Sequence, residues 1–377
     1  MKMPKKIISS AIALSIACGT SVCVSALNVQ DIKDNAKQSA QNVIQNIYSR
    51  LPDSTSQNWK TVLQLLKNKS EKYSYKNGRL YLTEGDFKYL VHLSIKKGGS
   101  YARLISYSGN DTEITVPAYA DGFPVRYIYS FGELEENYRY SIKTLNIPET
   151  VKDISGADVF DLFGLENINI SPENPYITSI DGVAFDKSLT KLLALPSARK
   201  NYTIPNEVTS IGKYACYASS LENITFPENL LYIGEYAFFS SPNLKEISLP
   251  QSTEIIGDYA FAHCVNLQKA VLPFNTELYY SKVFEETSDG FAAISSQTVK
   301  LGEEIIVSTY DKNDDSTYAF YYKHSSDKKW HTQQNFTDMN ITVISPDKVG
   351  DYRICAKTKA PDGTVSKQYF DIKVTIY

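Results

Sequence analysis

Two short motifs recur in fixed order between residues 87 and 275, and this repetition limits the fold more than any other feature. The first motif has Leu at position i, Ile or Ala at position i+3 and a large apolar residue at position i+5, and a proline follows directly. It begins at Leu221, Leu244 and Leu267, a spacing of 23 residues. The second motif, Ile-Gly-x-Tyr-Ala followed by Cys or Phe, alternates with the first. Such a period is typical of stacked units that each contact only their neighbours.

The spacing predicts where the side chains of each unit point. In a short strand, the i+3 and i+5 side chains lie on one face, so both should enter the core. The proline prevents the strand from continuing, and the Ile-Gly pair turns the chain. The last residue of the second motif should then return to the core, which predicts buried rings at Phe238 and Phe261. Tyr214, Tyr236 and Tyr259 should form a half-buried column with their hydroxyls in solvent.

The two motifs resemble those of BspA-like leucine-rich repeats, whose copies read Leu-x-x-Ile-x-Leu-Pro followed by Ile-Gly-x-x-Ala-Phe. The resemblance includes the opening segment at Glu113–Pro117 and an interrupting Ile180–Phe185 segment. Cys216 departs from the pattern, because the family has Phe at this position. The resemblance implies a leucine-rich-repeat solenoid in a secreted or surface-displayed protein that serves adhesion or protein binding. It implies no catalytic residue.

The first residues predict export. Three lysines precede an apolar run from Ile7 to Val24, which ends in Ser25-Ala26. This is the pattern of a secretory signal peptide over residues 1–26. We therefore expect a secreted or cell-surface protein with no membrane span after cleavage.

The remaining chain is expected to be mainly β. Residues 27–72 carry helical periodicity, and a cap, a docking arm, a stalk, a removable pro-segment or a dimerisation segment all remain open for them. Asn77-Gly78 between two alternating runs predicts a hairpin, so a β segment should open the repeat domain, residues 73–290. Residues 291–377 contain short strands at regular spacing, which predicts a C-terminal β-sandwich. This part resembles the triple-tyrosine, immunoglobulin-like modules of secreted bacterial proteins.

Three cysteines follow the signal peptide, and the repeat register predicts that they do not pair. Cys216 and Cys264 lie two repeats apart, which separates parallel backbones by about 10 Å. A disulfide needs Cα atoms within about 7 Å. Cys355 falls in the C-terminal part, so we predict three free thiols, with the two in the repeats buried.

The sequence offers little for catalysis, and we expect a non-enzymatic protein without a cofactor or a metal. The four histidines lack zinc-ligand spacing, and no phosphate-binding glycine loop is present. Cys355 with His324 or His331 could form a nucleophilic pair, but a buried thiol is the favoured interpretation. Asp311–Asp315 has oxygen ligands at alternating positions, yet it lacks the glycine and the final glutamate of a calcium loop. A hairpin turn is favoured there.

The residues that alternate with the buried strand positions should face outward on the concave side of the repeats. We expect this surface to bind a protein of a host or a neighbouring cell. The alternative is that the chain is a polysaccharide-binding accessory protein, whose ligand is a glycan. Nucleic acid is not expected, because the sequence shows no basic stripe and the net charge of -3 is too small to indicate a partner. The candidate residues are Thr144, Asn146, Asn167, Asn169, Asn201, Thr203, Asn223, Thr225, Glu246, Ser248 and Lys269, with Val271 beside them.

Overall fold

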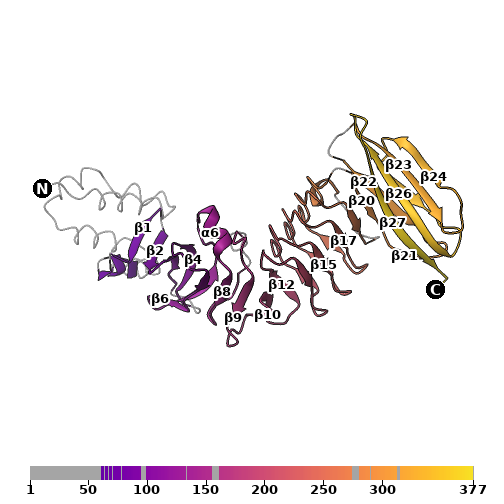
Figure 1. Ribbon diagram of the computed structural model, residues 1–377. Coiled ribbons are helices and arrows are strands. Elements are labelled where there is room, and N and C mark those ends of the chain that lie inside the picture. The colour runs from indigo at the N-terminus through magenta and orange to yellow at the C-terminus, as the bar shows by residue number, and fades with distance from the viewer. Residues whose placement is uncertain are drawn as a thin grey trace, which may run out of the picture. The chain divides into compact units, whose positions relative to one another are not determined.

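The computed structural model describes residues 61–376, apart from 63, 67, 70, 78, 95–98, 133, 155–160, 274–279, 289 and 312–314. The predicted signal peptide and most of the predicted helical segment lie outside these residues, and the described residues from 61 to 68 are helical. The chain divides into two compact units, whose elements are labelled in Figure 1. Unit 1 comprises Met1–Asn110, Pro117–Leu134 and Thr150–Asp153, and unit 2 comprises Asp111–Val116, Glu135–Glu149 and Ile154–Tyr377.

Unit 1 is built on one six-stranded sheet with the order β1-β2-β3-β4-β7-β6. Lys76 of β1 pairs with Arg79 of β2, and Asn77 has a φ of +50°. The hairpin predicted at Asn77-Gly78 is therefore confirmed. The strands are β1 (Tyr73–Lys76), β2 (Arg79–Glu84), β3 (Phe87–His92), β4 (Tyr101–Tyr107), β6 (Tyr119–Ala120) and β7 (Phe123–Ile128).

The repeats of unit 2 contribute short parallel strands to two ladders. The first ladder is divided among three sheets: β5 (Glu113–Thr115), β8 (Thr144–Ile147) and β9 (Asn167–Ile170) form one, β13 (Asn201–Thr203) and β15 (Asn223–Thr225) form a second, and β17 (Glu246–Ser248) and β19 (Lys269–Val271) belong to a third. The second ladder contains β14 (Ser210–Ile211), β16 (Tyr232–Ile233) and β18 (Ile255–Ile256), which follow the antiparallel strands β10 (Ile177–Ile180), β11 (Val183–Asp186) and β12 (Lys191–Ala194). Two short helices, α6 (Glu136–Ser141) and α7 (Tyr280–Val283), accompany them.

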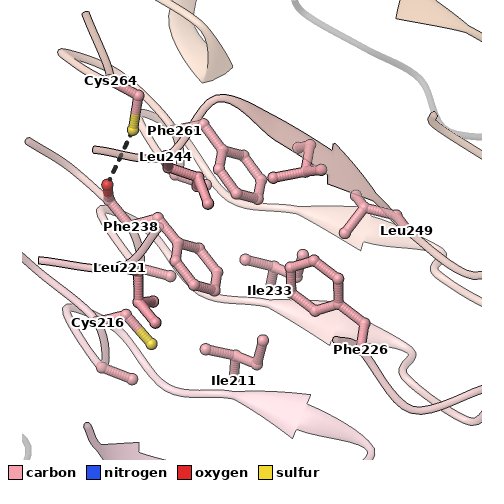
Figure 2. Packing of buried hydrophobic residues seen from close by; sticks show 14 of the residues in the cluster. Ile211, Cys216, Leu221, Phe226, Ile233, Phe238, Leu244, Leu249, Phe261 and Cys264 are labelled. Atoms are coloured by element: carbon pink, nitrogen blue, oxygen red, sulfur yellow. Dashed lines mark hydrogen bonds between the residues drawn. The ribbon is translucent and has the colours of Figure 1, made fainter. Parts of the chain in front are cut away.

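The core of the repeats is a column of stacked rings, drawn in part in Figure 2. Phe238 and Phe261 are completely buried, and their ring centroids lie 4.9 Å apart. The column continues through Phe284, 5.6 Å from Phe261, to Phe291. Burying one such ring contributes roughly 1.5 to 3 kcal/mol. The inward position predicted for both motif phenylalanines is confirmed, and Cys216 occupies the same place one repeat earlier.

One strand, β20 (Phe291–Ile294), belongs to two cores at once. It pairs in parallel with β19 of the last repeat and antiparallel with β22 (Ile305–Tyr310). Phe291 and Ala293 pack into the repeat core, whereas Ala292 and Ile294 pack into a second apolar core. All four residues are buried, because a central strand covered on both faces has no solvent side.

The second core lies between two five-stranded sheets, in the orders β17-β19-β20-β22-β25 and β21-β27-β26-β23-β24. Phe320, Ile354 and Ile372 contribute to it from the second sheet. The immunoglobulin-like character of residues 291–377 stays a prediction. The further strands are β21 (Thr298–Lys300), β23 (Thr317–His324), β24 (His331–Thr337), β25 (Ile341–Ile344), β26 (Gly350–Lys359) and β27 (Val365–Thr375).

The three cysteines among the described residues are free, as predicted, and all three are buried. Burial raises the pKa of the Cys216 thiol, and it raises the pKa of the Cys264 thiol to about 12. Neither thiol is therefore ionised at neutral pH.

Candidate protein-interaction surface

The outward residues of the first ladder form aligned columns, which we call the strand face. Parallel pairing places Asn146 beside Asn169, Asn201 beside Asn223, and Thr203 beside Thr225. The strand face comprises Thr144, Asn146, Asn167, Asn169, Asn201, Thr203, Asn223, Thr225, Glu246, Ser248 and Lys269. Seven of these are exposed: Asn169, Asn201, Thr203, Asn223, Thr225, Glu246 and Ser248. The other four are partly buried.

The asparagine side chains of the strand face bond to one another. The Asn223 Nδ2 donates to Asn201 Oδ1 over 2.7 Å, and the Asn169 Nδ2 donates to Asn146 Oδ1 over 2.9 Å. Asn146 in turn donates to the carboxylate of Glu113 over 2.7 Å. Each amide still has donor or acceptor capacity for a ligand, because an amide group has two N–H donors and two lone pairs. The bonds hold the side chains in one orientation before any ligand arrives.

A hairpin interrupts the strand face between β9 and β13. The Ile168 N–H donates to the carbonyl of Gly182, at the tip of the β10–β11 hairpin, over 2.8 Å. Gly182 has a φ of +74°, and a Cβ added there would lie 2.6 Å from Asn167 Oδ1. Only glycine fits this close approach. The strand face therefore has two parts: residues 144–169 and residues 201–269.

The strand face ends at β19. We expected Val271 to face outward beside Lys269, and this expectation is wrong. Val271 does leave the repeat core, but it is only 8% exposed and packs into the second core with Ala292 and Ile294. The reason is that β19 and β20 belong to one five-stranded sheet of the C-terminal part, and the other sheet packs on this face of it.

Ion pairs between successive repeats border the strand face. Lys143 pairs with Glu166 at 3.2 Å, and Lys200 pairs with Glu222 at 3.1 Å, and each of the four residues directly precedes a strand. The lysine and the glutamate are largely exposed, so each pair adds little stability. In each pair the charges of the lysine and the glutamate compensate each other at the border of the strand face. The strand face itself carries mainly uncharged hydrogen-bonding groups.

Residues in and just after the second motif form two columns of rings that run from repeat to repeat. Tyr214, Tyr236 and Tyr259 are half-buried as predicted, and their rings stack at 5.2 and 5.0 Å. Because the ring faces cover one another, mainly edges are left for solvent. Tyr217, Phe239 and His263 form a parallel column that the sequence analysis missed, since its residues differ in type from repeat to repeat.

The geometry around Cys355 does not support a nucleophilic pair. The thiol is hydrogen-bonded to Tyr369, and burial raises its pKa, whereas a reactive cysteine needs a lowered one. The His324 ring contacts Ser326 Oγ and the carbonyl of Val349, and His331 contacts Asp327. Cys355 also points away from the second core that holds Ile354 and Ala356, so it is buried on the outer face of its sheet.

Two further expectations concern membranes and metals. Among the residues that the structure describes, no helix has the length and apolar character needed to cross a membrane. Within the same residues, no group of three or more His, Cys, Asp or Glu is placed to hold a metal ion. Residues 312–314 of the calcium-loop candidate lie outside the described part of the chain, so the hairpin turn there stays a prediction.

Parallel ladders, a stacked aromatic core and the two alternating motifs define a leucine-rich-repeat solenoid. In sequence, residues 135–202 and 197–310 match the model of the BspA type leucine rich repeat region. Comparison with curated proteins finds no match.

Several solved structures are similar in part. A leucine-rich repeat protein from Eubacterium ventriosum is 22% identical over 43% of this chain and 44% of its own, with a TM-score of 0.37. One from Bacteroides ovatus is 23% identical over 58% of both chains, with a TM-score of 0.31. A leucine rich cell surface protein from Faecalibacterium prausnitzii is 18% identical over 52% of this chain and 89% of its own, with a TM-score of 0.23. The match spans less than half of the Eubacterium protein.

Proposed function

We propose that the protein is a secreted or cell-surface adhesin that binds an extracellular protein of a host or a neighbouring cell through the strand face. The observation that carries this proposal is the alignment of exposed Asn and Thr side chains on rigid strands, with Asn201 and Asn223 already oriented by a mutual hydrogen bond. Pre-oriented polar groups bind with less loss of conformational freedom than mobile ones. BspA-type repeats support the same role.

The part of the strand face between β13 and β19 is the better candidate for the contact. Asn223, Thr225, Glu246 and Ser248 are all exposed there, while Thr144, Asn146 and Asn167 are partly buried. A protein partner can approach neutral Asn, Thr and Ser groups without removing water from many charges, which lowers the cost of association. We take this protein to be a binding protein and not an enzyme.

A binding screen tests the proposal. Residues 27–377 would be tested against immobilised extracellular-matrix proteins, bacterial surface proteins and glycans. A variant with Thr225→Arg and Ser248→Arg places two bulky cations on the strand face. The matched control, Asn206→Arg with Asn229→Arg, changes two exposed residues of the turns that follow β13 and β15 and adds the same charge.

We expect saturable binding to a protein, with an affinity at least about ten-fold lower for the strand-face variant. The control variant should bind like the unchanged protein. Equal binding by both variants would move the contact away from the strand face. Binding to glycans alone would favour the polysaccharide-binding alternative.

A further inference from the structure

The outer face of the second C-terminal sheet has a charge pattern unlike the rest of the molecule. Alternate residues of β23, β26 and β27, such as Phe320, Ile354 and Phe370, point into the second core. Their neighbours along each strand point to the opposite side. This outer face carries Lys323, Arg353, Lys357, Lys359, Lys367 and Lys373, against Asp351 and Asp371. It is strongly basic in a chain whose net charge is -3.

The register places two of these cations directly opposite two others. Lys323 pairs across the strands with Arg353, and Lys357 pairs with Lys367. Like charges in this position lie roughly 5 Å apart at Cβ and destabilise a sheet. Asp371 lies 3.4 Å from Arg353, but among the described residues no carboxylate forms an ion pair with Lys323, Lys357 or Lys367. The fold thus retains an unfavourable arrangement of charge on this face.

An aromatic row lies between the two cationic pairs. Cys355 stands opposite both Tyr321 of β23 and Tyr369 of β27, so the two rings flank the buried thiol in one row across the sheet. The Lys357 Nζ lies 4.2 Å from the centroid of the Tyr321 ring, and the Arg353 guanidinium lies 5.0 Å from that of Tyr369. Each cationic row is two residues from the aromatic row, or about 7 Å along the strands.

One further exposed ring, Trp330, lies beside the aromatic row. Trp330 is 41% exposed and Tyr369 of the row is 38% exposed, and their ring centroids lie 6.3 Å apart. Lys328 and Lys329, both exposed, precede Trp330 in the turn before β24. Exposed rings beside clustered cations form a surface for a ligand that offers both flat apolar faces and negative charge.

We propose that this outer face binds an acidic polysaccharide, with its sugar rings on the aromatic row and its anionic groups on the two cationic rows. A sugar ring has a C–H face that packs on an aromatic ring, and an acidic polymer presents charged substituents on both of its edges. A single-stranded nucleic acid carries its charge along one backbone, which fits two flanking cationic rows less well. This site is separate from the strand face and does not depend on the proposed function.

The test compares the binding of the full chain to polygalacturonate, to neutral dextran and to single-stranded poly(dT). We expect salt-sensitive binding to polygalacturonate and none to dextran. Lys357→Gln with Lys367→Gln should weaken polygalacturonate binding about ten-fold. Lys357→Arg with Lys367→Arg should retain it. The matched control, Lys88→Gln with Lys187→Gln, removes the same charge from exposed positions elsewhere and should bind normally.

A stability measurement separates lost binding from lost folding. The Lys357→Gln, Lys367→Gln variant should unfold at the same temperature as the unchanged protein or a higher one, because the substitution removes a like-charge pair. The inference would be overturned by a full chain that does not bind polygalacturonate at low salt, or by an equal loss in the control variant. Binding of poly(dT) as tight as that of polygalacturonate would also overturn it.

Discussion

The thiol of Cys264 donates a hydrogen bond over 3.2 Å to the backbone carbonyl of Phe238 (Figure 2). Phe238 is the buried ring that ends the second motif of the preceding repeat. Ser241 makes the same contact with the carbonyl of Cys216 one repeat earlier, also at 3.2 Å. The two cysteines of the repeats therefore occupy different positions. Cys216 stands where the later repeats have the buried rings of Phe238 and Phe261. Cys264 stands where the preceding repeat has Ser241, which bonds to a neighbouring repeat.

This relationship predicts how Cys264 responds to substitution. Cys264→Ser should change the free energy of unfolding by less than about 1 kcal/mol, because a hydroxyl can make the same bond. Cys264→Ala should cost about 1 to 3 kcal/mol, since it leaves the buried carbonyl of Phe238 without this donor. Denaturant unfolding measures both. If the serine variant loses more stability than the alanine variant, the thiol is not acting as a donor.

Truncation of the central ring tests the aromatic core. Phe261→Ala should lower the free energy of unfolding by about 3 to 5 kcal/mol, because Phe261 is completely buried between Phe238 and Phe284 and its cavity cannot easily collapse. Equilibrium unfolding in urea gives the value. A loss below about 1 kcal/mol would contradict the packing described here.

The strand face should behave in the opposite way. Asn223→Ala should change the stability by no more than about half a kcal/mol, because the side chain is exposed and its one bond, to Asn201, is exposed as well. The same unfolding assay applies. A large loss would mean that the Asn223–Asn201 contact stabilises the fold instead of orienting a binding surface.

The buried thiols predict a loss of stability at high pH. An unfolded thiol ionises near pH 8.5, whereas burial raises the pKa of Cys264 in the folded protein to about 12. For an acid whose folded pKa is raised, the stabilisation is complete below the unfolded pKa and is lost as the pH rises. One such thiol should lower the free energy of unfolding by about 1.4 kcal/mol per pH unit between roughly pH 9 and pH 10.

The comparison with Cys264→Ser isolates this effect from the tyrosines that titrate in the same range. Between pH 9 and pH 10, the free energy of unfolding of the variant should fall less steeply with pH than that of the unchanged protein. The difference in slope should equal the contribution of one thiol. Parallel curves for the two proteins would show that Cys264 ionises in the folded state as readily as in the unfolded state.

The sequence predicted the repeat architecture well because each position of the motif recurs in the same environment. Phe238 and Phe261 enter the core, and Tyr214, Tyr236 and Tyr259 form the half-buried column, because the same packing recurs in successive repeats. The free thiols of Cys216 and Cys264 followed from the repeat register.

Features formed by segments without a periodic signal could not be predicted in this way. All four residues of Phe291–Ile294 are apolar, and such a run does not reveal that alternate residues serve different cores. The covering of Val271 depends on that strand. The place of Gly182 against Asn167 depends on a hairpin whose contacts lie outside the repeat pattern. The hydrogen bonds between asparagines require side-chain orientations that no sequence spacing specifies.

The sharing of β20 has a mechanical consequence. A load on the C-terminal sheets reaches the last repeat through the backbone hydrogen bonds that join β19, β20 and β22. Tension on a partner held by either part would therefore be carried by paired strands. Inserting one more repeat before β19 would preserve this junction and change only the number of rungs between it and β13.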